Sequence, residues 1–332
     1  MAAKTGNIIA LYRVLYEYTD EEHPYTMRDI QDRLEEMHHP CSEDTILRYM
    51  NIMREWNIDV EAKMGRNASY YLSSRVLRKE ELKLIVDAVN ASNFIEPEIA
   101  DEMTQKLKNL LSENQRGYLD RNVLGMVNNK TENRKILENV DVIQEACDMK
   151  AQISFTYMKW DRNLKLVPKS VKPEVVNPWN LIWADDRYYL YALKEKNGRL
   201  EERHYRVDKM KNVAIIENKS REGMSKVRNI NPNTYVSRRM GMFTGEEKKI
   251  RIAAGEEMVG PIVDQFGRDI RVMENAEASG ADDSLLIEFE AVPSIILLGW
   301  LAGLGGVEVL APSEVRAGMI AMLDKSLSRY RR

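Results

Sequence analysis

The residues best suited to chemistry in this chain are aromatic and cationic side chains gathered around one short turn. The stretch before the turn is "DDRYYLYALKEK", and the stretch after it is "RLEERHYRVDKMKNV". Between them, Asn197 and Gly198 are a strong signal for a two-residue hairpin turn. Aromatic rings stack on nucleobases or sugars, and the planar guanidinium of arginine pairs with phosphate. The pattern therefore suggests an anion site built on a β-hairpin.

Four residues are the ligand-binding candidates for this site. Tyr189 offers a flat ring and a hydroxyl, and Tyr157 in the nearby stretch "ISFTYM" would complete the wall. Arg203 and Arg206 are three residues apart, so they lie on opposite faces of a strand and only one of them faces Tyr189. The structural alternative is that Tyr189 belongs to the core and that Arg206 pairs with Asp208.

The segment around this hairpin is the most cationic part of the chain. Residues 150–211 contain 14 Lys and Arg against 8 Asp and Glu, whereas the formal net charge of the whole chain is -3. An anionic partner is therefore more plausible here than elsewhere, and salt would weaken its attraction. We expect a nucleotide or a short single-stranded nucleic acid, because a neutral metabolite fits the charge poorly.

A second set of candidates follows from the stretch "SEDTILRYMNIMREW", which has the spacing of an amphipathic helix. Ser42 is the expected N-cap, and two acids follow it in the first turn, where the helix dipole favours them. Ile46, Met50 and Met53 point inward, which turns polar positions outward. The DNA-binding candidates are Ser42, Thr45, Arg48 and Asn51 on this helix, and Lys63, Arg66 and Asn67 on the hairpin that follows.

These candidates differ in the contacts that their side chains can make. Arg48 favours guanine and Asn51 favours adenine in the major groove, and Thr45 is placed to reach a base edge. Ser42, at the start of the helix, is better suited to a phosphate. The hairpin residues suit phosphate or the minor groove.

The elements that position these residues predict a winged helix-turn-helix over residues 1–75. Three amphipathic stretches, "NIIALYRVLYEY", "YTMRDIQDRLEEM" and "SEDTILRYMNIMREW", precede two alternating ones, "IDVEAKM" and "ASYYL", which flank the turn Gly65-Arg66-Asn67. With 13 acids against 9 cations in residues 1–75, a protein-interaction module is the alternative. Residues 46–75, however, contain five cations and three acids, and a docking surface needs only local cations.

The remaining patterns predict an α+β multidomain chain. Three amphipathic helices come first, and five or six short strands within about seventy residues then indicate a small barrel or curled sheet. A polar, turn-rich segment separates these strands from a compact α+β region. The predicted domains are the winged helix-turn-helix at 1–75, a helical connector at 76–149, a β-barrel domain at 150–220, a linker at 221–245 and a C-terminal α+β domain at 246–332.

Catalysis finds little support in the sequence. The motifs GxSxG, HExxH and Walker A are absent, and "GLGG" at Gly303–Gly306 lies between a helix and a strand, the reverse of a dinucleotide loop. We interpret it as a helix stop and tight turn. Cys41, Cys147 and four scattered histidines lack zinc-site spacing. We therefore expect a protein that is not an enzyme and needs no cofactor or metal.

The sequence also lacks the features of a membrane or secreted protein. No apolar run reaches roughly 18 residues, which a transmembrane helix requires. The start "MAAKTGNIIALYRVLYEY" lacks the cationic beginning and long apolar centre of a signal peptide. Two cysteines without a paired motif fit a reducing compartment. We expect a cytoplasmic protein with no membrane partner.

Taken along its length, the chain resembles the bacterial WYL-domain transcription regulators. The marker tripeptide appears as Tyr188-Tyr189-Leu190, with tyrosine in place of tryptophan, and Pro178 to Leu181 matches the proline-aromatic-x-leucine pattern upstream. "RHYRVDKM", at Arg203 to Met210, matches the pattern Arg-x-Phe-Arg-Leu-Asp-Arg-Ile with conservative replacements. "SEDTILRYM" is similar to the recognition helix of the family, with Tyr49 replacing an aspartate. "WLAGLGGVEVLAP" resembles the C-terminal extension.

The resemblance implies an Sm-like small β-barrel for the WYL domain, a ligand-sensing role for it, and usually a dimer. We expect a ligand-responsive regulator that binds a double-stranded DNA operator as a homodimer. The alternative is a WYL accessory protein that binds single-stranded RNA or DNA and modulates a defence nuclease, and a third reading is a scaffold that binds no DNA. The apolar run "IILLGWLAGLGG" would contribute to the dimer or else form the core of the C-terminal domain.

Overall fold

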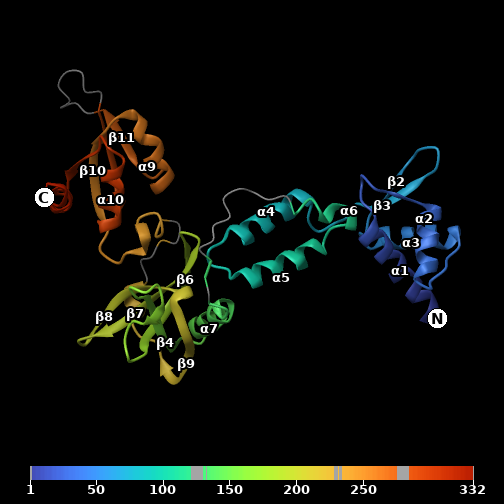
Figure 1. Ribbon diagram of the computed structural model, residues 1–332, viewed down its shortest axis with the longest axis horizontal. Helices are drawn as coiled ribbons and strands as arrows, with labels where there is room; N and C mark the ends of the chain where they lie inside the picture. The colour runs from blue at the N-terminus through green and yellow to red at the C-terminus, as the bar shows by residue number, and fades with distance from the viewer. Residues whose placement is uncertain are drawn as a thin grey trace. The chain divides into compact units, whose positions relative to one another are not determined.

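The structure is a computed structural model that describes residues 2–120, 130–131, 133–227, 231, 234–274 and 284–331. The chain divides into two compact units, an N-terminal unit of residues 1–134 and a C-terminal unit of residues 135–332. Helices dominate the first unit and antiparallel sheets the second (Figure 1). The predicted α+β multidomain class is confirmed. Among the described residues, no helix combines the length and the apolar character needed to cross a membrane.

The N-terminal unit opens with the predicted winged helix-turn-helix. Three helices precede a hairpin, and the hairpin joins a short strand in a three-stranded sheet of order β1-β3-β2. Further helices follow (Figure 1). The elements are α1 (Ala2–Tyr18), β1 (Tyr25–Thr26), α2 (Met27–Glu36), α3 (Glu43–Glu55), β2 (Val60–Lys63), β3 (Ser69–Leu72), α4 (Lys79–Ala91), α5 (Pro97–Lys108) and α6 (Glu113–Arg116).

Local sequence explains where these helices begin and which face they bury. The Thr26 side chain accepts a hydrogen bond from the backbone N–H of Asp29, whose carboxylate accepts one from the Thr26 N–H at 2.9 Å. This reciprocal capping box starts α2. In α3, the predicted inward residues Ile46, Met50 and Met53 are all buried in the core of the unit. Full burial of each such side chain contributes about 1.5–3 kcal/mol.

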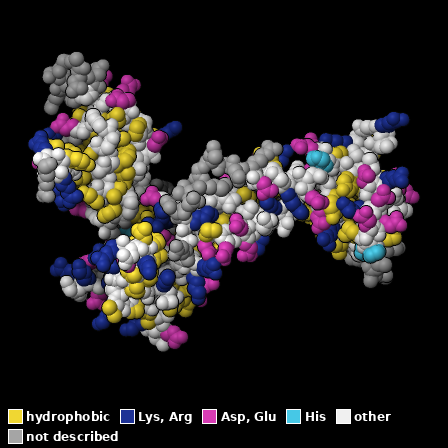
Figure 2. All heavy atoms as spheres, in the orientation of Figure 1, with side chains coloured by type: hydrophobic (Ala, Val, Ile, Leu, Met, Phe, Trp, Pro, Cys, Tyr) yellow, Lys and Arg dark blue, Asp and Glu magenta, His cyan; other side chains and the backbone are white. Residues whose placement is uncertain are grey.

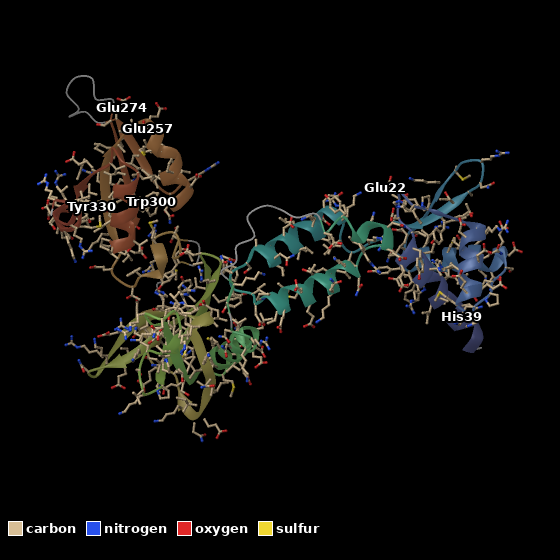
Figure 3. The ribbon with its side chains drawn as sticks, in the orientation of Figure 1. Glu22, His39, Glu257, Glu274, Trp300 and Tyr330 are labelled. Carbon is tan, nitrogen blue, oxygen red and sulfur yellow. The ribbon has the colours of Figure 1, made fainter. Side chains whose placement is uncertain are left out.

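The winged helix-turn-helix is tied to the first helices that follow it. The Arg75 guanidinium donates to two backbone carbonyls at the end of α1, at 2.6 and 2.8 Å, and to the carbonyl of Leu110 at 3.2 Å. Lys79, at the start of α4, donates to Glu22 at 2.7 Å, and Glu22 is labelled in Figure 3. The connector therefore continues directly from the winged helix-turn-helix, without a free linker at residue 75.

The C-terminal unit contains one helix and a curled sheet, followed by a second sheet covered by helices (Figure 1). Its elements are α7 (Ile136–Asp148), β4 (Ala151–Trp160), β5 (Leu166–Pro168), β6 (Glu174–Ala184), β7 (Arg187–Lys196), β8 (Arg199–Arg206), η1 (Val207–Lys209), β9 (Met210–Ser220), α8 (Met224–Val227), η2 (Met240–Met242), β10 (Lys248–Ala254), η3 (Glu256–Met258), α9 (Val259–Phe266), β11 (Arg271–Glu274), β12 (Leu285–Ala291), α10 (Ile295–Gly303), β13 (Glu308–Ala311) and α11 (Ser313–Tyr330).

The first sheet is antiparallel and has the order β5-β4-β6-β7-β8, with β9 pairing to β4 as well. Helix α7 contacts β4, β6 and β9. Its Ile136 and Ile143 are buried, and the side chain of Asn139 donates to the carbonyl of Met210 at 3.1 Å. The sequence placed this helix in the connector of residues 76–149. It belongs to the sheet domain instead, because its apolar face has the sheet as its partner.

The second sheet has the order β11-β12-β10-β13, and its elements follow one another as β-α-β-β-α-β. Helices α9, α10 and α11 contribute to a single core with the inward face of the strands. Leu297 and Leu301 of the apolar run are buried in that core, whereas Ile295 is 58% exposed. The run mainly builds the domain core, and Trp300 of the same helix is labelled in Figure 3. Gly305 and Gly306 have positive φ angles, so the predicted helix stop and turn is confirmed.

Candidate anion site and nucleic-acid interface

The hairpin of β7 and β8 brings Tyr189 and Arg206 together. Its turn residues, Asn197 and Gly198, have φ angles of 53° and 72°, as a two-residue turn of this kind requires. The turn fixes a register in which Tyr189 lies opposite Arg206. Cross-strand partners share a face of the sheet, so the aromatic and the cationic residue are neighbours. The backbone N–H of Arg206 donates to the hydroxyl of Tyr157, on β4, at 3.2 Å.

Arg206 is fixed by a carboxylate two residues further along the chain. Its Nε and one terminal nitrogen donate to the two oxygens of Asp208 at 3.0 and 2.6 Å. This is a bidentate, charge-assisted pair. Burial opposes the charge of Arg206, but the pairing with Asp208 outweighs it and raises the pKa of Arg206 above its ordinary value. The guanidinium is thus held charged and oriented, and the Arg206–Asp208 pair of the structural alternative is present.

Further cations surround this pair. Burial and the positive charge of Arg206 lower the pKa of Lys209, and Arg187 and Lys169 act on it in the same direction. The Lys169 ammonium lies 5.8 Å from the centre of the Tyr157 ring. Figure 2 shows Lys and Arg side chains gathered over the sheet that contains β7 and β8. We call this group the cationic cluster, and its members are Tyr157, Lys169, Arg187, Tyr189, Arg206, Asp208 and Lys209.

The structure decides between the predicted alternatives for two of the candidates, Arg203 and Tyr189. Arg203 lies opposite Ala192, hence on the other face of the hairpin from Tyr189, and it pairs with Glu201. It does not join the cluster. Tyr189 is only 8% exposed, so its ring packs in the core and does not present an open stacking face. Burial raises the pKa of Tyr189, while the nearby charge of Arg206 acts in the opposite direction.

Three of the cluster's cations were not among the candidates predicted from the sequence. Lys209 lies inside the stretch "RHYRVDKM", where its position after Asp208 was an available signal. Arg187 begins β7, and its nearness to the predicted tyrosines was also visible. Lys169 comes from the connection between β5 and β6, and only the fold brings it to Tyr157.

Helix α3 presents the predicted outward residues on the surface of the N-terminal unit. Arg48 and Asn51 are exposed, and Asn51 accepts a hydrogen bond from Arg54 at 2.8 Å. Ser42 is the N-cap by position, but its hydroxyl makes no capping bond and lies 2.9 Å from the hydroxyl of Thr45. Thr45 is half-buried, so it is less available than Arg48.

The wing of the winged helix-turn-helix is the β2–β3 hairpin with antiparallel register. Arg66 and Asn67 are exposed in its turn, and Met64 beside them is 87% exposed. Lys63 differs from the other wing candidates because it donates to the backbone carbonyl of Glu21 and so stabilises the unit itself. The exposed tip therefore retains one cation and one amide for nucleic acid.

The described residues contain no group of three or more His, Cys, Asp or Glu side chains placed to hold a metal ion. Both sites described above consist of cations, aromatic rings and amides, which recognise anions and nucleic acid bases.

Comparison with known proteins gives two domain matches. Residues 138–215 match the WYL domain, and residues 247–327 match the WCX domain. The first match includes most of α7, all of β7 and β8, and the cationic cluster, and the second covers the sheet of β10 to β13 with α9, α10 and most of α11. No significant match was found among curated proteins.

Solved structures similar to this chain include the proteasome accessory factor B/C (PafBC) of Arthrobacter aurescens. It is 13% identical with a TM-score of 0.28, and the match covers 96% of this chain and 46% of that chain, so this chain spans less than half of its length. Another is described as a CRISPR Cas-related protein, 12% identical with a TM-score of 0.37, covering 99% of this chain and 86% of that chain. The chain therefore contains a WYL domain followed by a WCX domain, a combination typical of WYL-domain regulators.

Proposed function

We propose that this chain is a DNA-binding transcription regulator whose WYL domain senses an anionic ligand, a nucleotide or a short single-stranded nucleic acid. The observation that carries the proposal is the cationic cluster, in which a carboxylate orients Arg206 beside three further cations. Among the members of the cluster, Lys169, Arg187, Arg206 and Lys209 are cationic and Asp208 is acidic, and Asp185 also acts on Tyr189. Burial, together with the repulsion among these cations, lowers the pKa of Lys209. A bound anion would reduce that repulsion.

The chemistry of the cluster suits phosphate more than a carboxylate metabolite. Asp208 already holds the planar guanidinium of Arg206 in one orientation, so little side-chain freedom is lost when Arg206 donates to an oxyanion. The Tyr157 hydroxyl lies beside the backbone of Arg206 and offers a neutral hydrogen-bonding group for a sugar or base. Because the Tyr189 ring is buried, stacking on that ring is not part of the proposal.

The N-terminal unit would read duplex DNA. Arg48 and Asn51 are exposed on α3 and have the side chains that recognise guanine and adenine in the major groove. Arg66 at the wing tip would contact phosphate. A ligand that prefers one arrangement of a homodimer would change the spacing of two such heads and hence the affinity for an operator. The proposal assigns the chain no catalytic step.

The test uses the purified full-length protein and two matched arginine variants. Arg206→Ala removes the preset guanidinium, and Arg203→Ala removes one from the opposite face of the same strand. Binding of a 5′-phosphorylated oligothymidine and of its unphosphorylated form is measured by fluorescence anisotropy at low and moderate salt. Loss of a charge-assisted hydrogen bond of about 1.5–3 kcal/mol predicts binding roughly 10- to 100-fold weaker for Arg206→Ala only.

Three results would contradict parts of this proposal. Equal weakening by both variants would mean that charge alone, without the cluster's geometry, attracts the oligonucleotide. Unchanged binding by Arg206→Ala would remove the cluster as the sensor. Binding of single strands without binding of any duplex from the chain's own promoter region would leave the sensor in place and remove the operator function.

A further inference from the structure

The segment between the WYL and WCX domains packs like a structural element, although its sequence predicted a linker at residues 221–245. Tyr235 is 5% exposed, and Met242 is also buried. Both lie in one core cluster with Tyr189 and Tyr191 of β7. The turn over residues 234–242, which we call the coupling turn, is therefore attached to the face of the WYL sheet that carries Tyr189 and Arg206.

The attachment to the WYL sheet is specific. The hydroxyl of Tyr235 lies 2.9 Å from Nε2 of His204 on β8. The ring of Tyr235 is 5.7 Å from that of His204 and 5.8 Å from that of Tyr191, between ring centres. Tyr191 and His204 are cross-strand partners, and they are the next pair on this face after Tyr189 and Arg206. One pair of residues thus separates the coupling turn from the candidate ligand site.

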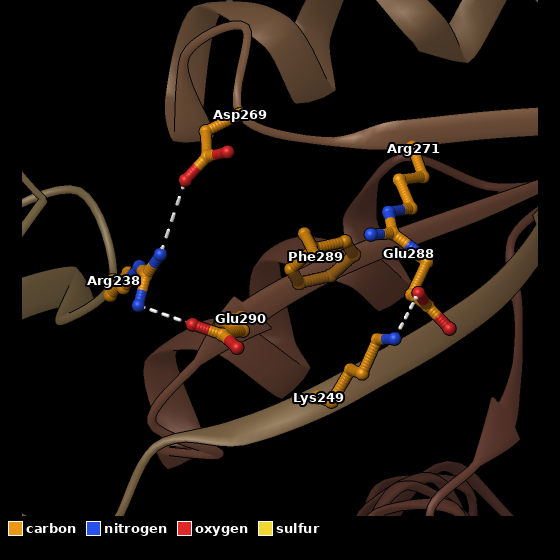
Figure 4. Close-up of a pocket in the computed structure, with 7 residues that line it drawn as sticks. All are labelled: Arg238, Lys249, Asp269, Arg271, Glu288, Phe289 and Glu290. Carbon is orange, nitrogen blue, oxygen red and sulfur yellow. Dashed lines mark hydrogen bonds and ion pairs between the residues drawn. The ribbon is translucent and has the colours of Figure 1, made fainter.

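The other attachment is made to the WCX domain by two arginines of the same turn. Arg239 is buried, with its guanidinium carbon 3.8 Å from the centre of the Tyr235 ring, and it pairs with Glu247. Arg238 donates to Glu247 at 3.0 Å. Figure 4 shows Arg238 between Asp269 and Glu290, both of which it pairs with.

The backbone of the coupling turn is anchored as well. The N–H of Val292, directly after β12, donates to the carbonyl of Arg238 at 2.8 Å. A displacement of Arg238 would therefore act on two strands of the WCX sheet, through Glu247 before β10 and through Val292 after β12. Tyr235 and these two arginines are three and four residues apart, so one turn of chain holds both attachments.

We propose that the coupling turn transmits the state of the WYL ligand site to the WCX domain, through Tyr235 on one side and Arg238 and Arg239 on the other. A shift of the pair Tyr189 and Arg206 reaches the adjacent pair of Tyr191 and His204, because both pairs belong to the same two strands. The inference rests on the proposed function for the identity of the trigger. The link itself is a property of the apo protein and is tested without a ligand.

The experiment measures amide hydrogen exchange in the full-length protein. Arg206→Ala perturbs the ligand site, Tyr235→Phe removes the hydroxyl contact with His204 while keeping the ring, and the double variant combines them. Arg203→Ala is the matched control on the opposite face. The readout is the exchange of Val292 and of the β10 amides, which lie in the WCX domain.

We expect Arg206→Ala to change exchange at these WCX amides by about fivefold, the effect of roughly one hydrogen bond on a local opening equilibrium. Arg203→Ala should leave them within about twofold, and Arg206→Ala should have no further effect in the Tyr235→Phe background. If Arg206→Ala also raises the exchange of the core amides of β7, the experiment uses Arg206→Lys instead. This variant keeps the positive charge and loses the planar guanidinium.

The link is refuted if Arg206→Ala leaves the WCX amides unchanged, or if it changes them equally with and without the Tyr235 hydroxyl. These results are separate from those for oligonucleotide binding. A transmitted exchange effect without any loss of oligonucleotide binding would reject the proposed sensor and keep the link. Weaker oligonucleotide binding without a transmitted effect would reject the link and keep the sensor.

Discussion

Acidification from pH 7 to pH 5 should weaken the packing of β7, β8 and the coupling turn through one residue, His204. Burial, together with the positive charge of Arg239, lowers the pKa of His204 from 6.5 to about 4. In the unfolded chain the imidazole regains its ordinary pKa. Between these two values the unfolded chain binds a proton that the folded chain does not, so stability rises with pH in this window. The contribution of His204 is complete above pH 6.5 and is lost as the pH falls towards 4.

The size of the effect follows from the two pKa values. Each unit of pKa difference corresponds to about 1.4 kcal/mol. At pH 5 the unfolded chain is almost fully protonated at this residue and the folded chain is mostly neutral, which predicts a loss of about 2 kcal/mol relative to pH 7. Glu247 and Glu288 have pKa values below the ordinary 4.5, so their contributions disappear only at lower pH.

The assay is amide exchange of β7 and β8 at pH 7 and pH 5, corrected for the intrinsic exchange rate at each pH. His204→Gln is the reference, because glutamine keeps a polar side chain that does not titrate. The wild-type protein should lose about 2 kcal/mol more opening free energy than the variant. Equal losses in the two proteins would show that His204 is protonated without cost in the folded state, and the burial argument would then be wrong.

Three further predictions concern the other parts of the chain. Arg48→Ala should weaken binding to the preferred duplex by about 1–3 kcal/mol. Arg66→Ala should weaken binding to all duplexes alike and reduce by about one the slope of the log binding constant against log salt concentration. Gel shifts across several sequences and salt concentrations distinguish the two effects. Leu301→Ala should destabilise the WCX domain by about 2–5 kcal/mol in urea unfolding, and Ile295→Ala, at an exposed position of the same helix, should change it by less than about 1 kcal/mol. Light scattering should give the mass of two chains, and a single-chain mass unchanged by DNA would remove the homodimer from the mechanism.

The sequence predicted the elements well where one periodic pattern dominated. The inward set Ile46, Met50 and Met53 had a clear helical spacing, and the structure buries all three. Asn197 and Gly198 marked the turn between β7 and β8, because few other residue pairs adopt two positive φ angles. From that turn, the parity of strand positions correctly placed Arg203 and Arg206 on opposite faces.

What remained undetermined depended on contacts between distant segments. Strand parity could not decide which arginine shares a face with Tyr189, since that depends on the register of the hairpin. Lys169 lies in the connection between β5 and β6, and no local sequence pattern predicts that it comes close to Tyr157. The amphipathic pattern of residues 136–148 showed that α7 has a partner without showing that the partner is a sheet. Tyr235 lay in a polar stretch, where a single aromatic residue gives a weak signal of burial.

The hydrogen bonds of Arg75 limit how the winged helix-turn-helix can move relative to the helices that follow it. The Arg75 guanidinium joins the end of α1 to Leu110 through three hydrogen bonds, and burial lowers its pKa. A rotation of the winged helix-turn-helix about residue 75 would break these hydrogen bonds, each worth about 1.5–3 kcal/mol. It would also leave the buried charge of Arg75 without partners. The winged helix-turn-helix and the first connector helices therefore move as one rigid body. In the regulator proposed above, a ligand would therefore change operator affinity by moving each winged helix-turn-helix together with its first connector helices.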